Sequence, residues 1–320
     1  MTGDLAEPLP GVTPGDHRRP ALGYLLYLGA AVLFGINGTV SKFILLSGVE
    51  SARLSQLRVT AAFVVLLAVV ALTNRPALRL RRGELGLLVA YGVLGVAMTQ
   101  WLYFVAIARL PVGVALLIEF TAPFMVALWV RFGLHQPVPG RVWGALVIAL
   151  LGLSMVAQVW SGFVLDGLGV LAGFGAAAAL AVYYLLGERG VHGPYPRDAV
   201  SLTLWGFGAA ALFWFVVQPW WSFPWSTLAT TVQPFGSGSS DIPVTWFVVW
   251  MVVLGTVVPF WLVVKSLHHL SASQASVVGM TEPVIASLVA WVLLGEVLTP
   301  VQLVGGFVVL GGVLLAERSR

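Results

Sequence analysis

The chain has 320 residues, of which 59% are hydrophobic and only 9% are charged, and its mean hydropathy is +0.94. A soluble globular protein carries about 25% charged residues, so this chain lacks the polar surface that a water-soluble body needs. The net charge is only +4 and the basic residues are spread among loops, which argues against binding of nucleic acid. With no cysteine, disulfides and thiolate metal sites are excluded. The composition therefore predicts an integral membrane protein.

The chain begins with a polar segment, residues 1–21, that is rich in Pro and Gly. It lacks the apolar core and the small-residue cleavage site of a signal peptide. We expect it to be a disordered cytoplasmic tail. The first apolar stretch would then serve as an uncleaved insertion signal.

Ten apolar stretches follow, each near the roughly 20 residues that a membrane-spanning helix needs. Most of the connections between them are short, which predicts a tight antiparallel bundle. The sequence thus predicts an all-α integral membrane fold with ten transmembrane helices. The stretches cover approximately residues 22–46, 52–73, 84–108, 112–134, 141–160, 167–187, 199–219, 243–265, 272–294 and 300–316.

Lysine and arginine predict the orientation, because they are enriched in cytoplasmic loops. With the N-terminus inside, only Arg53 and Arg109 fall on the outer side, and Lys42 and Arg58 fall within the stretches. We therefore expect both termini to be cytoplasmic, in the cell (plasma or inner) membrane. The remaining basic residues, all on the inner side, are Arg18, Arg19, Arg75, Arg79, Arg81, Arg82, Arg131, Arg141, Arg189, Arg197, Lys265, Arg318 and Arg320.

The one long connection, residues 218–243, has no lysine or arginine, as expected of an outer loop. Its aromatic residues suit the headgroup region, where amphipathic rings settle. Two interpretations stay open: an anchor at the interface, or a mobile lid over a substrate path. The aromatic residues are Trp220, Trp221, Phe223 and Trp225.

An internal repeat is visible when the chain is shifted by 160 residues, because 95–128 then matches 255–288 without a gap. A weaker match, offset by about 146 residues, pairs the first stretch with the sixth. The chain thus divides into two five-helix halves, residues 22–160 and 167–316. Since five is odd, the second half must enter the membrane from the opposite side. Such inverted repeats are typical of secondary transporters that bind substrate between the halves near the midplane.

Three segments carry a resemblance to a known family: LFGINGTVSKF (33–43), QLRVTAAFVVLLAV (56–69) and ASVVGMTEPVIASLVAWVLLGEVLTPVQLVGGFVVLGGVLL (275–315). They resemble the first, second and closing helices of the drug/metabolite transporter superfamily, EamA-like branch. The resemblance extends over about residues 22–316. It implies ten spans, cytoplasmic termini, a central cavity and transport of small metabolites, but no particular substrate.

The two halves depart from one another at one place. The Thr-Glu-Pro of the second half corresponds to Thr121-Ala122-Pro123 in the first, and the acid there is Glu119, about one helical turn earlier.

Charge inside a membrane is costly, so Glu282 and Glu119 are the leading functional candidates. Glu282 lies about ten residues into its stretch, roughly 15 Å along the helix axis. Pro283, and Pro123 in the first half, remove a backbone donor and should kink their helices. A carbonyl freed at this depth must face protein or a watery cavity. We expect both acids to line that cavity, where burial favours the neutral form and suits either acid to proton coupling.

Two alternatives to cavity-lining acids stay open. Glu282 could be a neutral acid bonded to a neighbouring helix, and Glu119 could form a structural ion pair with Arg58 or Lys42. The two basic residues could in turn snorkel to the headgroups, pair structurally or bind an anionic group of the substrate.

Polar and aromatic side chains at membrane depth orient ligands in apolar pockets, although each alone is more often a contact between helices. As a set they predict a polar-lined substrate cavity. They are Asn37, Gln100, Tyr103, Tyr183, Trp205, Trp261 and Thr281.

No enzyme motif is present: the chain has no H-E-x-x-H, no G-x-S-x-G and no Walker A sequence. We expect no metal and no cofactor. The favoured function is a secondary transporter, with export as the favoured direction, that moves small metabolites by alternating access. The energy source could be the substrate's own gradient or a proton, and monomer and homodimer are equally open. The alternatives are an integral-membrane enzyme, or a lipid-handling or channel protein.

Overall fold

The computed structural model describes residues 19–107, 109–110, 112–159, 166–233, 241–294 and 299–318. The tail expected over residues 1–21 lies outside this part of the chain except for its last three residues, and Pro20 already begins the first helix.

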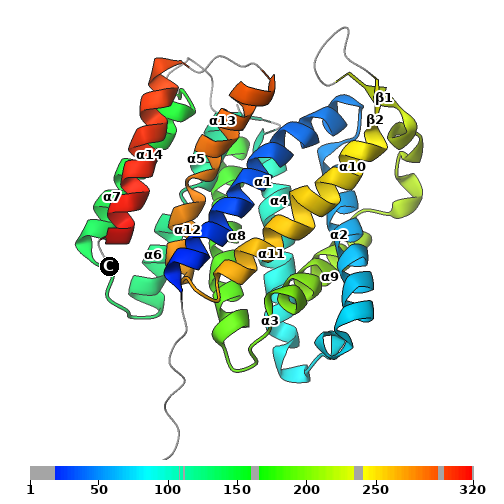
Figure 1. Cartoon of the computed structure of the whole chain (residues 1–320), viewed down its shortest axis with the longest axis horizontal. Helices are drawn as coiled ribbons and strands as arrows, with labels where there is room; N and C mark the ends of the chain where they lie inside the picture. Colours follow the sequence, from blue (N-terminus) through cyan, green and yellow to red (C-terminus); the bar gives the residue numbers. More distant parts are fainter. Residues whose placement is uncertain are drawn as a thin grey trace, which may run out of the picture.

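The first half of the chain forms helices throughout its apolar stretches (Figure 1). They are α1 (Pro20–Leu46), α2 (Ser51–Thr73), η1 (Arg75–Leu78), η2 (Arg82–Glu84), α3 (Leu85–Ala90), η3 (Tyr91–Ala97), α4 (Met98–Ile107), α5 (Val112–Glu119), α6 (Ala122–Leu128), η4 (Trp129–Gly133) and α7 (Gly140–Val156).

The second half follows the same order, with one pair of two-residue antiparallel strands in the long connection. Its elements are α8 (Gly167–His192), α9 (Ala199–Val217), η5 (Trp220–Ser222), η6 (Trp225–Ala229), β1 (Thr231–Val232), β2 (Ile242–Pro243), α10 (Val244–Val252), η7 (Val253–Val257), α11 (Val258–Ser266), α12 (Ala272–Gly279), α13 (Glu282–Leu294) and α14 (Pro300–Arg318).

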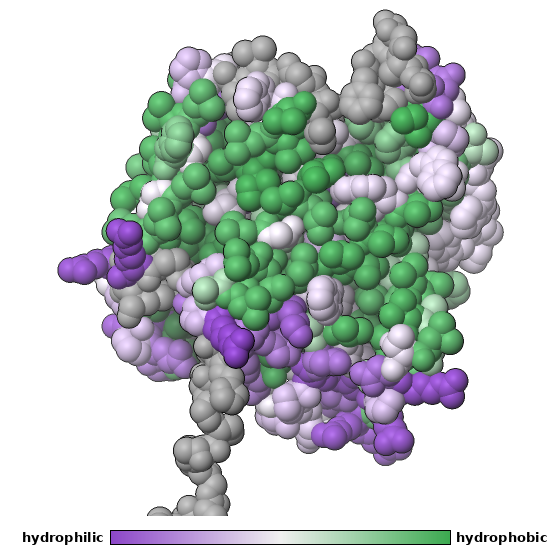
Figure 2. Space-filling view, in the orientation of Figure 1, coloured by the Kyte–Doolittle hydropathy of each residue, from purple (hydrophilic) through white to green (hydrophobic). Residues whose placement is uncertain are grey.

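The helices are apolar enough to be embedded in a bilayer. Within the described residues, seven helical segments have the length and composition to cross a membrane, and Gly140–Val156 and Pro300–Ala316 are shorter apolar helices. In Figure 2 hydrophobic side chains cover the middle of the visible face, and hydrophilic ones gather near the end at which α1 begins. The protein is therefore a helical, multi-pass membrane protein.

Helices from the two halves pack against one another in the centre of the molecule. α1 contacts α11 and α13, while α8 contacts α4 and α5. The outer edges are formed by two further pairs, α2 with α9 and α7 with α14, which lie on opposite sides in Figure 1. Each edge pair joins the two halves of the chain.

The α7–α14 pair packs backbone against backbone, because glycines face the partner helix. A Cβ added at Gly312 would lie 2.7 Å from the backbone nitrogen of Ala149, and one at Gly152 would lie 2.6 Å from that of Val309. Small residues at such positions let membrane helices approach closely.

Two apolar helical stretches are interrupted at matching places in the two halves. A turn at Phe120–Thr121 separates α5 from α6, and a turn at Met280–Thr281 separates α12 from α13. Pro123 and Pro283 each lie in the first turn of the new helix, where a missing backbone donor costs little. Thr121 and Met280 keep right-handed helical backbone angles, so each turn is a local interruption at the place where the sequence predicts a kink.

A second irregularity also recurs. The π-helical turns η3 and η7 end at Ala97 and Val257, which are 160 residues apart, as are the two breaks. π-Helical turns are rare and are often found at functional sites.

The beginning of the long connection is fastened to α2. Arg53 donates from Nη1 to the Pro219 carbonyl (2.8 Å) and from Nη2 to Ser222 Oγ (2.6 Å), and Gln56 Nε2 donates to the Gln218 carbonyl (2.5 Å). Phe223 is only 5% exposed. This part of the connection is therefore held against the helices, while residues 234–240 lie outside the described part of the chain.

Candidate functional site

The two acids predicted from the sequence flank the helix breaks. Glu119 is the last residue of α5 and is 8% exposed, whereas Glu282 is the first residue of α13 and is partly exposed. The partial positive charge at a helix N-terminus favours a carboxylate at Glu282, and the partial negative charge at a C-terminus opposes one at Glu119. The acids therefore occupy electrostatically different positions.

One arginine and one tyrosine lie within electrostatic range of the acids. Glu282 is close enough to interact electrostatically with Arg58, Glu119 and Tyr103. The cluster thus combines two carboxyl groups and a guanidinium from different helices, α5, α13 and α2. We name Arg58, Glu119 and Glu282 the central charge cluster.

Arg58 reaches from the first half into the second. Its Nε donates to Thr256 Oγ1 at 2.9 Å, and its guanidinium carbon lies 5.9 Å from the centre of the Phe260 ring. Thr256 is fully buried within the π-helical turn η7. The arginine head group therefore lies between the two halves of the chain, in contact with Thr256 and Phe260 of the second half and within electrostatic range of Glu282.

Tyrosines from α1 and α8 meet beside this cluster. The hydroxyls of Tyr27 and Tyr184 hydrogen-bond to one another, and both side chains interact electrostatically with Glu282. The end of α12 approaches them so closely that a Cβ at Gly279 would lie 2.7 Å from Tyr27 Oη and 2.8 Å from Tyr184 Oη. Gly279 thus allows the broken helix to reach the tyrosine pair.

Two buried amides have unpaired polar atoms within the described ranges. They are Asn37 Oδ1 and both Nε2 and Oε1 of Gln100, with the residues 5% and 9% exposed. Leaving a buried polar atom unpaired costs about 1–3 kcal/mol, so a polar ligand or water that pairs with it would be bound favourably. The Asn37 carboxamide packs on the backbone of η7, because a Cβ added at Gly255 would lie 2.0 Å from Asn37 Oδ1.

The other predicted residues occupy varied positions. Tyr183 stacks on Tyr91 with ring centres 5.2 Å apart, and Thr281 Oγ1 donates to the Val278 carbonyl (2.7 Å) at the end of α12. Trp261 is partly buried. Trp205 donates its indole N–H to the Ala77 carbonyl (3.4 Å), so it lies at the helix ends near the 74–84 connection. The side chain of Lys42 lies outside the described part of the structure.

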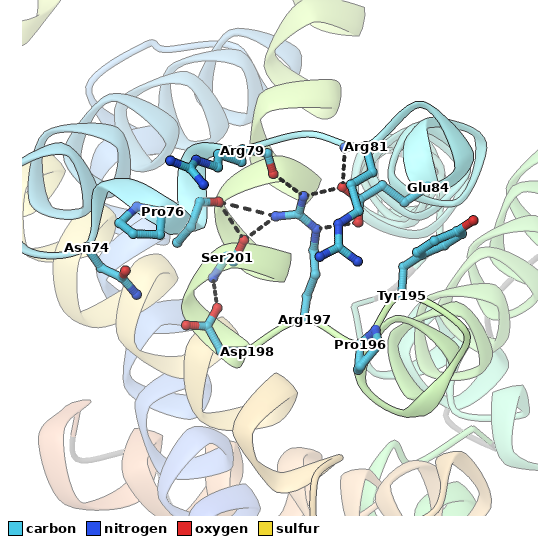
Figure 3. A pocket seen from close by; sticks show the side chains of 11 residues that line it. Asn74, Pro76, Arg79, Arg81, Glu84, Tyr195, Pro196, Arg197, Asp198 and Ser201 are labelled. Atoms are coloured by element: carbon cyan, nitrogen blue, oxygen red, sulfur yellow. Dashed lines mark hydrogen bonds and ion pairs between the residues drawn. The ribbon is translucent and has the colours of Figure 1, made fainter.

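A polar cluster between the connections that precede α3 and α9 was not predicted from the sequence (Figure 3). Arg197 binds Glu84 through Nε–Oε2 (2.9 Å) and Nη2–Oε1 (2.5 Å), and the two side chains are only 9% and 3% exposed. Arg197 also donates to the carbonyls of Ala77 (3.3 Å) and Arg79 (2.7 Å) and to the Ser201 hydroxyl. The only sequence signal of this cluster is Glu84, an acid that follows several arginines at the start of the third apolar stretch.

Among the described residues, no group of three or more His, Asp and Glu side chains is placed to hold a metal ion.

Comparison with known proteins gives the family. The sequence profile of the EamA-like transporter family matches residues 21–158 and 167–317. An uncharacterized transporter of Archaeoglobus fulgidus is 29% identical, with 89% of this chain and 93% of the relative covered. The threonine/homoserine exporter RhtA of Escherichia coli K12 is also 29% identical, with 72% of this chain and 70% of the relative covered.

One solved crystal structure has the same fold, with a TM-score of 0.72, 18% identity and coverage of 93% of this chain and 98% of the other. The relatives are named as transporters, which points to transport rather than catalysis. The two profile matches together cover most of the sequence, and the chain belongs to the EamA-like transporter family.

Proposed function

We propose that this protein is a secondary transporter that exports small metabolites of the amino-acid type by alternating access. The observation that carries the proposal is the central charge cluster: Glu119 ends α5 and Glu282 begins α13 at the two helix breaks, and Glu282 lies within electrostatic range of both Glu119 and Arg58. An amino acid presents one carboxylate and one ammonium group, so Arg58 suits the first and the acids suit the second. The naming of RhtA as a threonine/homoserine exporter supports this substrate class and direction.

The architecture that we propose is ten transmembrane helices arranged as two inverted five-helix repeats, residues 22–160 and 167–316. The two family matches, 21–158 and 167–317, support these bounds. The packing supports a pseudo-twofold relation as well: α1 packs on α11, α12 and α13, as α8 packs on α4, α5 and α6. The excess of inner lysine and arginine supports cytoplasmic termini in the cell membrane.

In this mechanism the broken helices surround the substrate. Helix ends in mid-membrane supply partial charges for ionic groups, as in other transporters with inverted repeats. The N-terminus of α13 lies at Glu282 and that of α6 at Ala122. Substrate binding between the halves would pair the polar atoms of Gln100 that are otherwise unpaired.

Proton coupling through Glu282 is the finer part of the proposal. Glu282 alternates between binding a proton and binding the substrate ammonium group, so that the proton and the substrate move in opposite directions. Partial exposure of Glu282 gives it access to either partner. Glu119 is the second candidate, and its position at a helix C-terminus favours the neutral form.

The test is transport of a panel of amino acids by purified protein in liposomes, with and without a pH gradient. Glu282→Gln should abolish transport or its dependence on the gradient while leaving the thermal unfolding profile unchanged. Glu50→Gln, which removes an exposed acid beside α2, is the matched control and should transport normally. Wild-type transport by Glu282→Gln at every pH would refute proton coupling, and failure of every amino acid tested would refute the substrate class.

A further inference from the structure

A pocket of about 390 Å³ lies beside the Arg197–Glu84 pair, between the connection that follows α2 and the one that precedes α9 (Figure 3). It therefore lies between segments of the two halves, and none of its lining residues belongs to the central charge cluster. It is lined by Asn74, Pro76, Ala77, Arg79, Arg81, Glu84, Tyr195, Pro196, Arg197, Asp198 and Ser201.

Some charged side chains of the pocket have hydrogen-bonding or ion-pair partners in the described part of the chain and others do not. Arg197 and Glu84 neutralise one another, and Asp198 Oδ1 accepts the backbone N–H of Ser201 (2.8 Å) as the N-cap of α9. Among the residues that the structure describes, the guanidinium of Arg79 has no hydrogen-bonding or ion-pair partner. Arg81 interacts with Glu84 only at the level of charge and through its own backbone N–H. Two arginine side chains are thus left to bind an anion.

The remaining polar groups suit a phosphate group. Guanidinium groups bind phosphate oxygens through two parallel N–H donors, and they are enriched wherever such groups are recognised. Asn74 and Tyr195 add an amide and a phenol at the same pocket. Both arginines are exposed, so an incoming group can reach them.

Exposed leucines stand next to the lining residues in the sequence. The pocket lies where α2 ends and where α3 and α9 begin, and exposed leucines flank it: Leu72 is 83% exposed, Leu80 41% and Leu85 41%. A basic pocket at the end of transmembrane helices, next to exposed apolar side chains, is the arrangement that receives an anionic lipid headgroup together with its acyl chains.

We propose that this pocket binds the phosphate group of an anionic phospholipid through Arg79 and Arg81. The bound headgroup bridges segments from both halves and reinforces the Arg197–Glu84 contact beside it. A soluble phosphate compound would offer the same chemistry without the acyl chains, and the experiment separates the two sources. The site is independent of the transported substrate.

The test measures binding to purified full-length protein in detergent by thermal unfolding. The probes are phosphatidylglycerol, phosphatidylcholine with the same acyl chains, glycerol 3-phosphate and inorganic phosphate. A ligand that binds the native protein raises its melting temperature. Wild-type protein should be stabilised by phosphatidylglycerol and not by the other three.

Two double variants distinguish a specific site from a general attraction between basic surface residues and anionic lipid. Arg79→Gln with Arg81→Gln removes the pocket arginines, whereas Arg75→Gln with Arg82→Gln removes the same charge from exposed residues that do not line the pocket. We expect phosphatidylglycerol to bind about 30-fold more weakly to the pocket variant and less than about threefold more weakly to the control. Equal melting temperatures of both variants in phosphatidylcholine establish that both fold.

Each remaining outcome decides the proposal. Equal weakening in the two double variants, or no stabilisation of wild-type protein by any probe, would overturn the site. Stabilisation by glycerol 3-phosphate or inorganic phosphate that only the pocket variant loses would keep the phosphate site and overturn the lipid as its source.

Discussion

The buried pair of Arg197 and Glu84 is the most highly connected polar contact in the described part of the molecule. Arg197 donates to a carboxylate, a hydroxyl and two backbone carbonyls, so all five of its N–H donors are used. Such a pair adds little stability over apolar residues, but losing one member leaves an uncompensated charge. Its main effect is to fix how the 74–84 connection meets α9.

Arg197→Gln should therefore destabilise the protein by about 1.5–3 kcal/mol, because Glu84 loses its two hydrogen bonds from the guanidinium and keeps only the one from the Arg81 backbone N–H. Thermal unfolding in detergent measures the change. Adding Glu84→Gln should recover part of the loss, since the buried charge is then removed. Arg189→Gln, an exposed arginine in the last turn of α8, should change stability by no more than about 0.5 kcal/mol. Equal losses at the two arginines would contradict this account.

Arg58 has the corresponding importance at the central charge cluster. If it binds the substrate carboxylate, Arg58→Gln should weaken amino-acid binding about 10–100-fold, which is the cost of one charge-assisted hydrogen bond or more. Amino-acid amides, which lack the carboxylate, should bind wild-type protein and the variant equally. Competition against transport in liposomes measures both. A purely structural Arg58 would instead lower the affinity for acids and amides alike.

At the scale of elements, the edge pair of α7 and α14 depends on glycine. At Gly312 a Cβ would meet Ala149 N (2.7 Å) and Ala145 O (2.9 Å), both backbone atoms that cannot rotate away. The neighbouring Gly311 has open space around its Cβ position. Adjacent residues on one helix thus face entirely different surroundings.

Gly312→Ala should cost about 1–3 kcal/mol by forcing the two helices apart. Gly311→Ala should cost nothing, because alanine has the higher helix propensity and meets no atom. The comparison of the two variants by thermal unfolding cancels the effect of propensity. Similar stability of the two would mean that the helices separate without strain.

The elements were largely predictable from the sequence, and their irregularities were not. Apolar runs gave helix positions to within a few residues, as at 199–219 for α9 (Ala199–Val217). The prolines at 123 and 283 predict that the helices are irregular there. Whether such a helix bends or is interrupted depends on its neighbours, such as Tyr27 and Tyr184, against which the end of α12 packs. The π-helical turns have no pattern of their own in the sequence.

The site was predictable only where a charge lay inside an apolar run. Glu119, Glu282 and Arg58 stood out because membranes exclude charge. Arg197 and Glu84 looked like ordinary loop residues, since their contact joins positions 113 residues apart. A pattern of neighbouring residues in the sequence cannot predict a contact between residues that far apart.

At the scale of the whole molecule, the α2–α9 pair is fastened at both ends. Arg53 at the start of α2 bonds the segment after α9, and Arg197 before α9 bonds the segment after α2. Both contacts exist in the same structure. We therefore expect this pair to move as one unit during transport, with the broken helices rearranging around it.

Cross-linking tests that expectation, because the chain has no cysteine of its own. Arg53→Cys with Ser222→Cys, joined by a short bifunctional thiol reagent, should leave transport in liposomes intact. The single variants treated with the reagent are the controls. Loss of transport on cross-linking alone would place a moving gate at this end of the pair.

The constant separation of the two helix breaks has a consequence for changes in chain length. The two halves differ in one length: the connection after α9 (218–243) is longer than the one after α2 (74–84). They agree in another, because the ends of η3 and η7 and the two breaks are each 160 residues apart, so the chain from the π-helical turn to the break has the same length in both halves. Each residue inserted within a helix turns the residues after it by about 100°, so one extra amino acid within α12 would move the turn at Met280–Thr281, and Glu282 after it, away from its present place near Arg58. Natural variation in length is thus expected in the long connection, and insertions or deletions within 95–128 and 255–288 should be selected against.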